Sequence, residues 1–149
     1  MKMPGRRSLI NRRGNPHGIT MSGLTKTYRD WPVFQMAMTA SMDLFEATKS
    51  FPKEERFAMT DQIRRASRSV CSNLVEAWGK RRYRLAFIAK LNDSESEALE
   101  TQFWIEMALL CNYLDSETAK RLDKTYDRII AQLVGLINSP ERWIRKKPG

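Results

Sequence analysis

The sequence predicts an all-α protein, an antiparallel up-and-down bundle of four helices. Apolar residues recur at intervals of three and four along four successive segments, and this spacing places them on one face of a helix. Proline, glycine and asparagine mark the ends of these segments, so the connections are short. Short connections make consecutive helices antiparallel neighbours, and 149 residues suffice for one domain.

The first helix is expected to begin with Asp30 as its N-cap and Pro32 in its first turn. Its apolar side consists of Val33, Phe34, Ala37, Ser41, Leu44, Phe45 and Thr48. Phe51 ends this helix because a residue before proline avoids the α conformation, and Pro52 is expected to open the second helix. The apolar face of the second helix consists of Phe57, Ile63, Ala66, Val70, Leu74 and Ala77, and Gly79 ends it.

The third helix, expected over residues 83–112, has two apolar stripes. The first contains Phe87, Leu91, Ala98, Ile105 and Leu109, and the second contains Ile88, Leu99, Phe103 and Leu110. One bundle core covers only one stripe, so the second predicts either a deeply placed helix or contact with another copy. Asp93, Glu97 and Glu100 lie on a third side, which we expect to face the arginines of a neighbouring copy.

The fourth helix is expected to begin after Asp115-Ser116 and to end at residues 138–140. Its apolar face consists of Leu122, Tyr126, Ile129, Leu133 and Leu136. This face completes the four amphipathic surfaces that the bundle requires.

Basic residues dominate both ends of the chain, whose formal net charge is +9. Residues 1–29 contain seven Lys/Arg and no acid, residues 141–149 contain four Lys/Arg and one acid, and residues 30–140 contain 15 bases and 16 acids. We therefore divide the chain into a mobile basic N-terminal arm (1–29), the bundle (30–140) and a basic C-terminal tail (141–149), with Met21 as an alternative start.

A second concentration of positive charge lies on the second helix and just beyond it. Its members are Arg64, Arg65, Arg68, Lys80, Arg81, Arg82 and Arg84. On a helical wheel the arginines lie away from the apolar centre, where guanidinium groups can pair with several phosphates in a salt-sensitive way. The pattern predicts a nucleic-acid-binding surface, and the alternative is a solvated face or ion pairs with neighbouring acids.

Residues suited to catalysis or metal binding are scarce. The one histidine, His17, lies in the arm. Asn73 and Glu76 are expected near the apolar side of the second helix, where they would bridge helices, and Glu76 has no partner acid or nucleophile within one turn. The acidic cluster Asp93, Glu95, Glu97 and Glu100 is more typical of a solvated face than of a cation site. We therefore expect no enzymatic activity, no cofactor and no metal.

Cys71 and Cys111 fall in apolar segments without CxxC spacing, so we interpret both as small core residues in a reducing compartment. No apolar run is long enough for a signal peptide or a membrane span. The cytoplasm is the expected location.

Between residue 31 and about residue 137 the chain resembles the bacterial four-helix bundle protein family. This family includes proteins encoded in intervening sequences of large-subunit ribosomal RNA genes and the accessory variability determinant protein of diversity-generating retroelements. The resemblance rests on Phe51-Pro52-Lys53-Glu54-Glu55-Arg56-Phe57, Gln62-Ile63-Arg64-Arg65-Ala66, Ser69-Val70, Asn73-Leu74-Val75-Glu76, Phe87, Ser94 and Glu97. Ala77 and Asp93 depart from the family pattern, which usually has small glycine-like residues there.

The resemblance implies an antiparallel four-helix bundle and, by similarity to the retroelement accessory protein, a homopentameric barrel with a basic, nucleic-acid-binding surface. The function that follows is non-enzymatic binding of structured RNA or RNA–DNA hybrids by an oligomer. The alternative is a protein-interaction scaffold or an accessory subunit that docks a reverse transcriptase in a diversity-generating retroelement.

Overall fold

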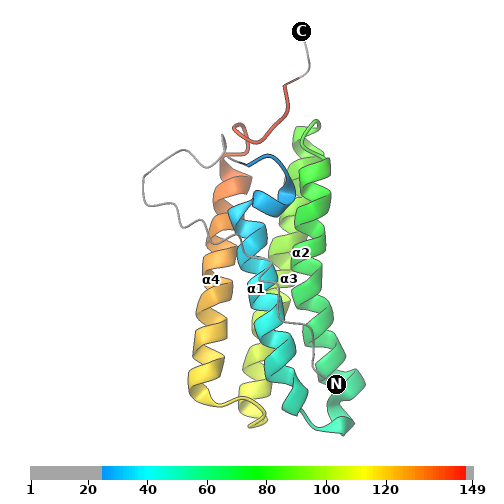
Figure 1. Cartoon of the computed structure of the whole chain (residues 1–149), viewed down its shortest axis with the longest axis vertical. Coiled ribbons are helices and arrows are strands. Elements are labelled where there is room, and N and C mark those ends of the chain that lie inside the picture. Colours follow the sequence, from blue (N-terminus) through cyan, green and yellow to red (C-terminus); the bar gives the residue numbers. More distant parts are fainter. Residues whose placement is uncertain (1–24, 147–149) are drawn as a thin grey trace, which may run out of the picture.

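The computed structural model describes residues 25–146, which form four helices in up-and-down order (Figure 1). The helices are α1 (Pro32–Ala47), α2 (Asp61–Gly79), α3 (Arg84–Leu110) and α4 (Ser116–Asn138). Each helix packs on the next, and α4 packs on α1, which closes the bundle. The predicted four-helix bundle is therefore confirmed, while His17, Met21 and most of the predicted arm lie outside the described residues.

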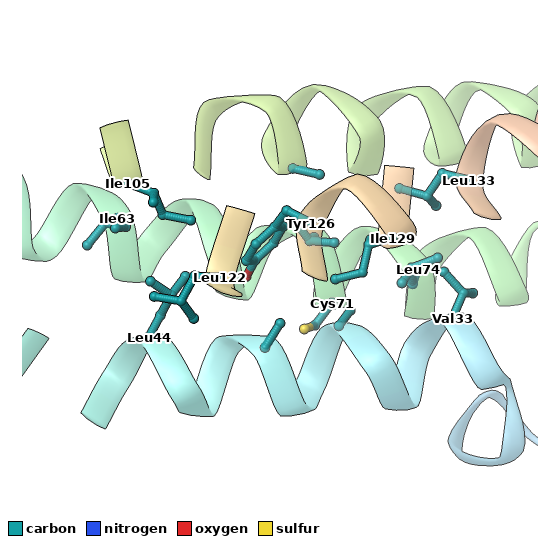
Figure 2. Close-up of a cluster of buried hydrophobic side chains, with 14 of the residues drawn as sticks. Val33, Leu44, Ile63, Cys71, Leu74, Ile105, Leu122, Tyr126, Ile129 and Leu133 are labelled. Atoms are coloured by element: carbon teal, nitrogen blue, oxygen red, sulfur yellow. The ribbon is translucent and has the colours of Figure 1, made fainter. Parts of the chain in front are cut away.

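All four helices contribute to one apolar core. Figure 2 shows side chains from them converging on the interior: Val33, Leu44, Ile63, Cys71, Leu74, Ile105, Leu122, Tyr126, Ile129 and Leu133. A few polar groups are buried with them and are hydrogen bonded across helices. The Ser41 and Ser67 hydroxyl oxygens lie 3.2 Å apart between α1 and α2, and the Ser94 hydroxyl of α3 donates to the Val70 carbonyl at 2.8 Å.

The start of α1 differs from the prediction by one residue. Asp30 does not cap α1 but belongs to a preceding 3₁₀ turn, Tyr28–Asp30, where it forms a capping box with Thr27. Trp31 is the N-cap of α1, and its extended backbone (φ −71°, ψ 118°) is the conformation that Pro32 imposes on the residue before it. The chain is thus structured before residue 30.

The connection between α1 and α2 is helical but irregular. After Pro52 come a 3₁₀ turn, Lys53–Glu55, and a π-helical turn, Arg56–Thr60, and regular α-helix begins only at Asp61. A π turn has more residues than an α turn, so it shifts the apolar register. Phe57, predicted in the core, is consequently 73% exposed, while Met59 is buried.

The two apolar stripes of α3 differ in their exposure to solvent. The first is buried in the core, apart from the half-buried Leu109, whereas in the second Leu99 is 51% and Phe103 is 50% exposed. We name the outward set the α3 apolar stripe: Leu85, Ile88, Leu99, Phe103 and Leu110. The helix therefore does not lie deep within the single bundle. Of the two explanations that the sequence offered for the second stripe, contact with another copy remains.

The prediction that both cysteines are core residues is confirmed for Cys71 and wrong for Cys111. Cys71 is buried, and burial raises the pKa of its thiol to about 12. Cys111 is exposed because it follows the last residue of α3, outside the helical repeat that carries the core positions. Asn112 beside it adopts a positive φ of 59°, the left-handed conformation that asparagine tolerates in tight turns.

Aromatic residues fill the end of the bundle at which α2 turns into α3. The Trp31 ring lies 5.4 Å from Trp78, 6.3 Å from Phe87 and 5.5 Å from Trp143, measured between centroids. Trp143 is buried although it lies in the segment predicted as a basic tail. Residues 141–146 therefore pack against the bundle at its upper end in Figure 1. Among the described residues, no helix is both long enough and apolar enough to span a bilayer.

Candidate nucleic-acid interface

The first basic cluster lies where α1 and α2 run side by side, around the Phe45 ring. The guanidinium carbons of Arg64 and Arg68 lie 4.8 Å and 6.0 Å from the ring centroid, and Lys49 Nζ lies 5.0 Å from it. Arg64 Nε also donates to Thr48 Oγ1 at 2.8 Å. Cations over an aromatic face are held in place without losing their charge. Lys49 also pairs with Glu46, with 3.1 Å between Nζ and Oε2, so the positive potential of this cluster comes from Arg64 and Arg68.

Neither Arg64 nor Arg68 forms an ion pair within residues 25–146. Both line a shallow surface depression of about 400 Å³ on the outer side of α2. Its lining is Asp61, Arg64, Arg65, Arg68, Ser69 and Ser72. The depression thus contains three guanidinium groups and one carboxyl, a composition that favours an anionic ligand.

Arg65 points to the opposite edge of α2 and is already paired with acids. Its guanidinium lies 2.6 Å from Glu100 Oε2 and 3.5 Å from Glu97 Oε1 on α3 of the same chain. The hydrogen bond to Glu100 raises the pKa of Arg65, and burial raises the pKa of Glu97. The expectation that these acids face the arginines of a neighbouring copy is therefore wrong, because α2 and α3 pack closely enough for the pairing to form within one chain.

The second basic cluster surrounds the turn between α2 and α3. Lys80 and Arg82 are exposed and unpaired within the described part of the chain. Arg84 is exposed but pairs with Glu141, with 3.0 Å between Nη2 and Oε1. α3 begins here after Tyr83 without a side-chain cap and without an acid in its first turn, so the positive end of the helix dipole adds to the local potential.

Arg81 is the most constrained member of the second cluster. Its Nε donates to the Trp78 carbonyl at 2.9 Å, and its guanidinium carbon lies 3.4 Å from the centroid of a Trp78 ring. Burial, together with the nearby Arg145, lowers the pKa of Arg81 to about 10. The guanidinium remains charged at neutral pH and has no carboxylate partner within residues 25–146.

The structure therefore divides the seven predicted residues between two clusters, one on α2 and one that runs from the turn after α2 to the first residue of α3. From Arg68 to its last residue, Gly79, α2 rises by roughly 17 Å at about 1.5 Å per residue, and Arg81 follows two residues later. Phosphates along one strand of a duplex are about 3.4 Å apart along its axis, so a segment on the order of six nucleotides would span both clusters.

Three residues of this surface were not predicted as binding residues. Phe45 near the end of α1 and Lys49 in the 3₁₀ turn that follows it, Thr48–Ser50, are four residues apart, and this spacing could have indicated an aromatic with a basic neighbour. Arg145 joins the second cluster because its backbone N–H donates to the Arg81 carbonyl at 2.8 Å. The buried Trp143 anchors that segment, and a tryptophan in a terminal segment is the signal in the sequence.

Glu76 and Asn73 are the polar residues that the sequence placed near the apolar side of α2. Glu76 is exposed and bridges α2 to α3 through Lys90, with 2.9 Å between Oε2 and Nζ. Asn73 is half-buried on the same side of α2. Within the described part of the chain, no three His, Cys, Asp or Glu side chains are grouped so that they could hold a metal ion.

The fold and the site define a closed antiparallel four-helix bundle with a basic surface on α2 and the turn after it. The chain belongs to the family of 23S rRNA-intervening sequence proteins, whose pattern matches residues 29–135. A solved structure from Bacteroides thetaiotaomicron, described as a protein with unknown function from the S23 ribosomal protein family, is similar to this chain. The two share 27% identity with a TM-score of 0.66, over 72% of this chain and 96% of that one. No curated protein sequence matches the chain.

Proposed function

We propose that this protein is a non-enzymatic, oligomeric nucleic-acid-binding protein of the cytoplasm that contacts structured RNA or RNA–DNA hybrids through α2. The observation that carries the proposal is the set of arginines on α2 and the turn after it that no carboxylate within residues 25–146 neutralises, chiefly Arg64, Arg68, Arg81 and Arg82. The family description, which refers to intervening sequences of 23S rRNA, supports RNA as the ligand.

The exposed α3 apolar stripe supports the oligomeric part of the proposal. Leucine and phenylalanine side chains aligned on one helix face are stabilised when a second apolar surface covers them. A contact between α3 of one copy and a different surface of the next is heterologous, and heterologous contacts form a ring when the rotation from copy to copy closes. A ring of five subunits is the assembly that the resemblance to the retroelement accessory protein implies.

An electrophoretic mobility shift over a salt series tests the binding. Single-stranded RNA, duplex DNA and an RNA–DNA hybrid are the probes, with particle mass from light scattering on the same sample. Salt-sensitive binding by a particle near five subunits is expected. A folded oligomer that shifts none of the probes at moderate salt would contradict the proposal and favour the alternative, an accessory subunit docking a protein such as a reverse transcriptase.

Substitutions on α2 test which arginines bind. Arg64→Gln with Arg68→Gln is expected to lower the slope of log affinity against log salt by about two, roughly one per phosphate contact. Arg65→Gln is expected to change this slope less than either of those substitutions does, because Glu97 and Glu100 already pair with Arg65. The matched control is Lys124→Gln with Arg128→Gln, which removes the same two charges from exposed positions on α4. Equal affinity and slope in the double variant and the control would remove Arg64 and Arg68 from the site.

A further inference from the structure

A hollow at the α2–α3 turn is rich in arginine and has no acid in its lining. It has a volume of about 270 Å³ and is lined by Trp78, Gly79, Arg81, Arg82, Tyr83 and Arg145. Half of these residues are arginines, and none is an acid. The nearby acid of the C-terminal segment, Glu141, is engaged by Arg84 instead.

The arginines of this hollow are brought together by the fold and not by sequence proximity. Arg81 and Arg82 follow the end of α2, whereas Arg145 arrives from beyond α4, 64 positions after Arg81. Two contacts fix its segment there: Trp143 packs 6.2 Å from Trp78 between ring centroids, and the Arg145 backbone N–H donates to the Arg81 carbonyl at 2.8 Å. A pocket wall made by two distant segments is therefore preformed.

Holding these guanidinium groups together is unfavourable in the protein alone. Arg81 is half-buried, with one face against Trp78, and Arg145 lies close enough to oppose its charge. Like charges near each other with no counter-charge raise the free energy of the folded state. An anion entering the hollow would relieve this repulsion, which is a physical reason for tight anion binding here.

We propose that this hollow is a phosphate-binding pocket in which Arg81, Arg82 and Arg145 hold one phosphate group. The planar guanidinium matches tetrahedral phosphate oxygens through paired N–H donors, and three such groups suit a multiply charged oxyanion better than a carboxylate. Tyr83 lines the pocket and is 65% exposed, so its ring is available to stack on a base attached to that phosphate. That the phosphate comes from a nucleic acid rests on the proposed function, and a free phosphate compound is the other source of the same chemistry.

The test uses the full chain and two probes, inorganic phosphate followed by ³¹P NMR and a short single-stranded RNA followed by mobility shift. Arg82→Gln and Arg145→Gln each remove one pocket guanidinium, and each is expected to weaken binding of both probes about tenfold or more. Arg142→Gln is the matched control, because it removes the same charge from an exposed residue of the same segment that does not line the pocket. Circular dichroism on each variant confirms that the bundle remains folded.

The outcomes separate the pocket from the proposed function. If wild-type protein binds RNA but both pocket variants bind as Arg142→Gln does, the pocket is overturned while the proposed function stands. If phosphate binds and is lost in the pocket variants while no RNA shifts, the pocket stands with a free phosphate compound as its ligand, and the proposed function fails. Absence of phosphate binding by wild-type protein together with unchanged RNA binding by the variants also overturns the pocket.

Discussion

Leu99 and Phe103 lie one turn apart at the centre of the α3 apolar stripe, and replacing both with glutamine tests whether the stripe joins copies of the chain. Complete burial of a leucine or phenylalanine side chain contributes about 1.5–3 kcal/mol. Leu99 is 51% and Phe103 is 50% exposed, so only half of each side chain remains to be covered. Covering both halves contributes about 1.5–3 kcal/mol per interface, and losing that weakens association roughly ten- to a hundredfold.

The assay is light scattering across a dilution series, with sedimentation velocity as a second measure of mass. Wild-type protein is expected to remain assembled at concentrations where Leu99→Gln with Phe103→Gln dissociates. Glutamine has a helix propensity close to that of leucine, so the variant bundle should stay folded. The control is Ala131→Gln, at an exposed position of α4.

Two results would refute this reasoning. If wild-type protein is monomeric at all concentrations, the stripe is not an interface between copies. If the double variant and the control dissociate at the same concentration, the interface lies elsewhere on the bundle. A variant that loses its helical circular dichroism signal calls for the single variants, because each leaves half of the stripe unchanged.

Two further predictions concern the core. At pH 8 a thiol with a pKa of about 12 is thiolate in only about one molecule in ten thousand, so the buried Cys71 should react with a thiol reagent only after unfolding. The exposed Cys111 should react in the native protein. Two thiols that react equally fast in the native protein would contradict this prediction. Tyr126→Phe should raise stability by about 1 kcal/mol in urea unfolding, because the Ser67 hydroxyl near the buried Tyr126 hydroxyl is too far for a good hydrogen bond and is already bonded to the Arg64 carbonyl; a loss of stability would show that Ser67 satisfies Tyr126.

The fold was predictable because its determinants are local. The apolar repeat of α4 alone predicted Leu122, Tyr126, Ile129, Leu133 and Leu136 as core residues; the first four are buried and Leu136 is half-buried. Asp115 was predicted to precede the same helix and caps it, accepting a hydrogen bond from the Thr118 N–H at 2.8 Å. Helical periodicity and capping depend on residues three or four positions apart, so the sequence displays them directly.

The irregular junction and the ion pairs were not predictable in this way. A helical wheel assumes 100° per residue, and the π turn at Arg56–Thr60 breaks that assumption, which is why Phe57 was placed in the core. Arg65 and Glu100 are separated by 35 positions, so their pairing depends on how α2 and α3 are rotated against each other. Net charge in a segment cannot distinguish an arginine with such a partner from one without.

The distribution of partners gives α2 two electrically different edges. On the α3 side, Glu97, Glu100 and Glu76 face Arg65 and Lys90, so that edge is neutralised within the chain. On the α1 side, Arg68 borders an apolar depression of about 370 Å³ lined also by Tyr28, Phe34, Met38, Ser41, Met42, Cys71, Ser72 and Val75.

Phosphates are attracted to unpaired guanidinium groups, whereas unpaired bases are stabilised against apolar and aromatic surfaces. Along α2 itself, the α1 side offers both surfaces together, since Arg64 and Arg68 stand beside the apolar depression and Phe45. The hollow at the following turn combines them again, in its arginines and Tyr83. A bound strand is therefore expected to follow α2 along its α1 edge toward the hollow at the α2–α3 turn, and exposed arginines outside these two regions contribute less than their number suggests. Net charge made nucleic acid a candidate ligand, but the pairing of individual residues determines where it binds.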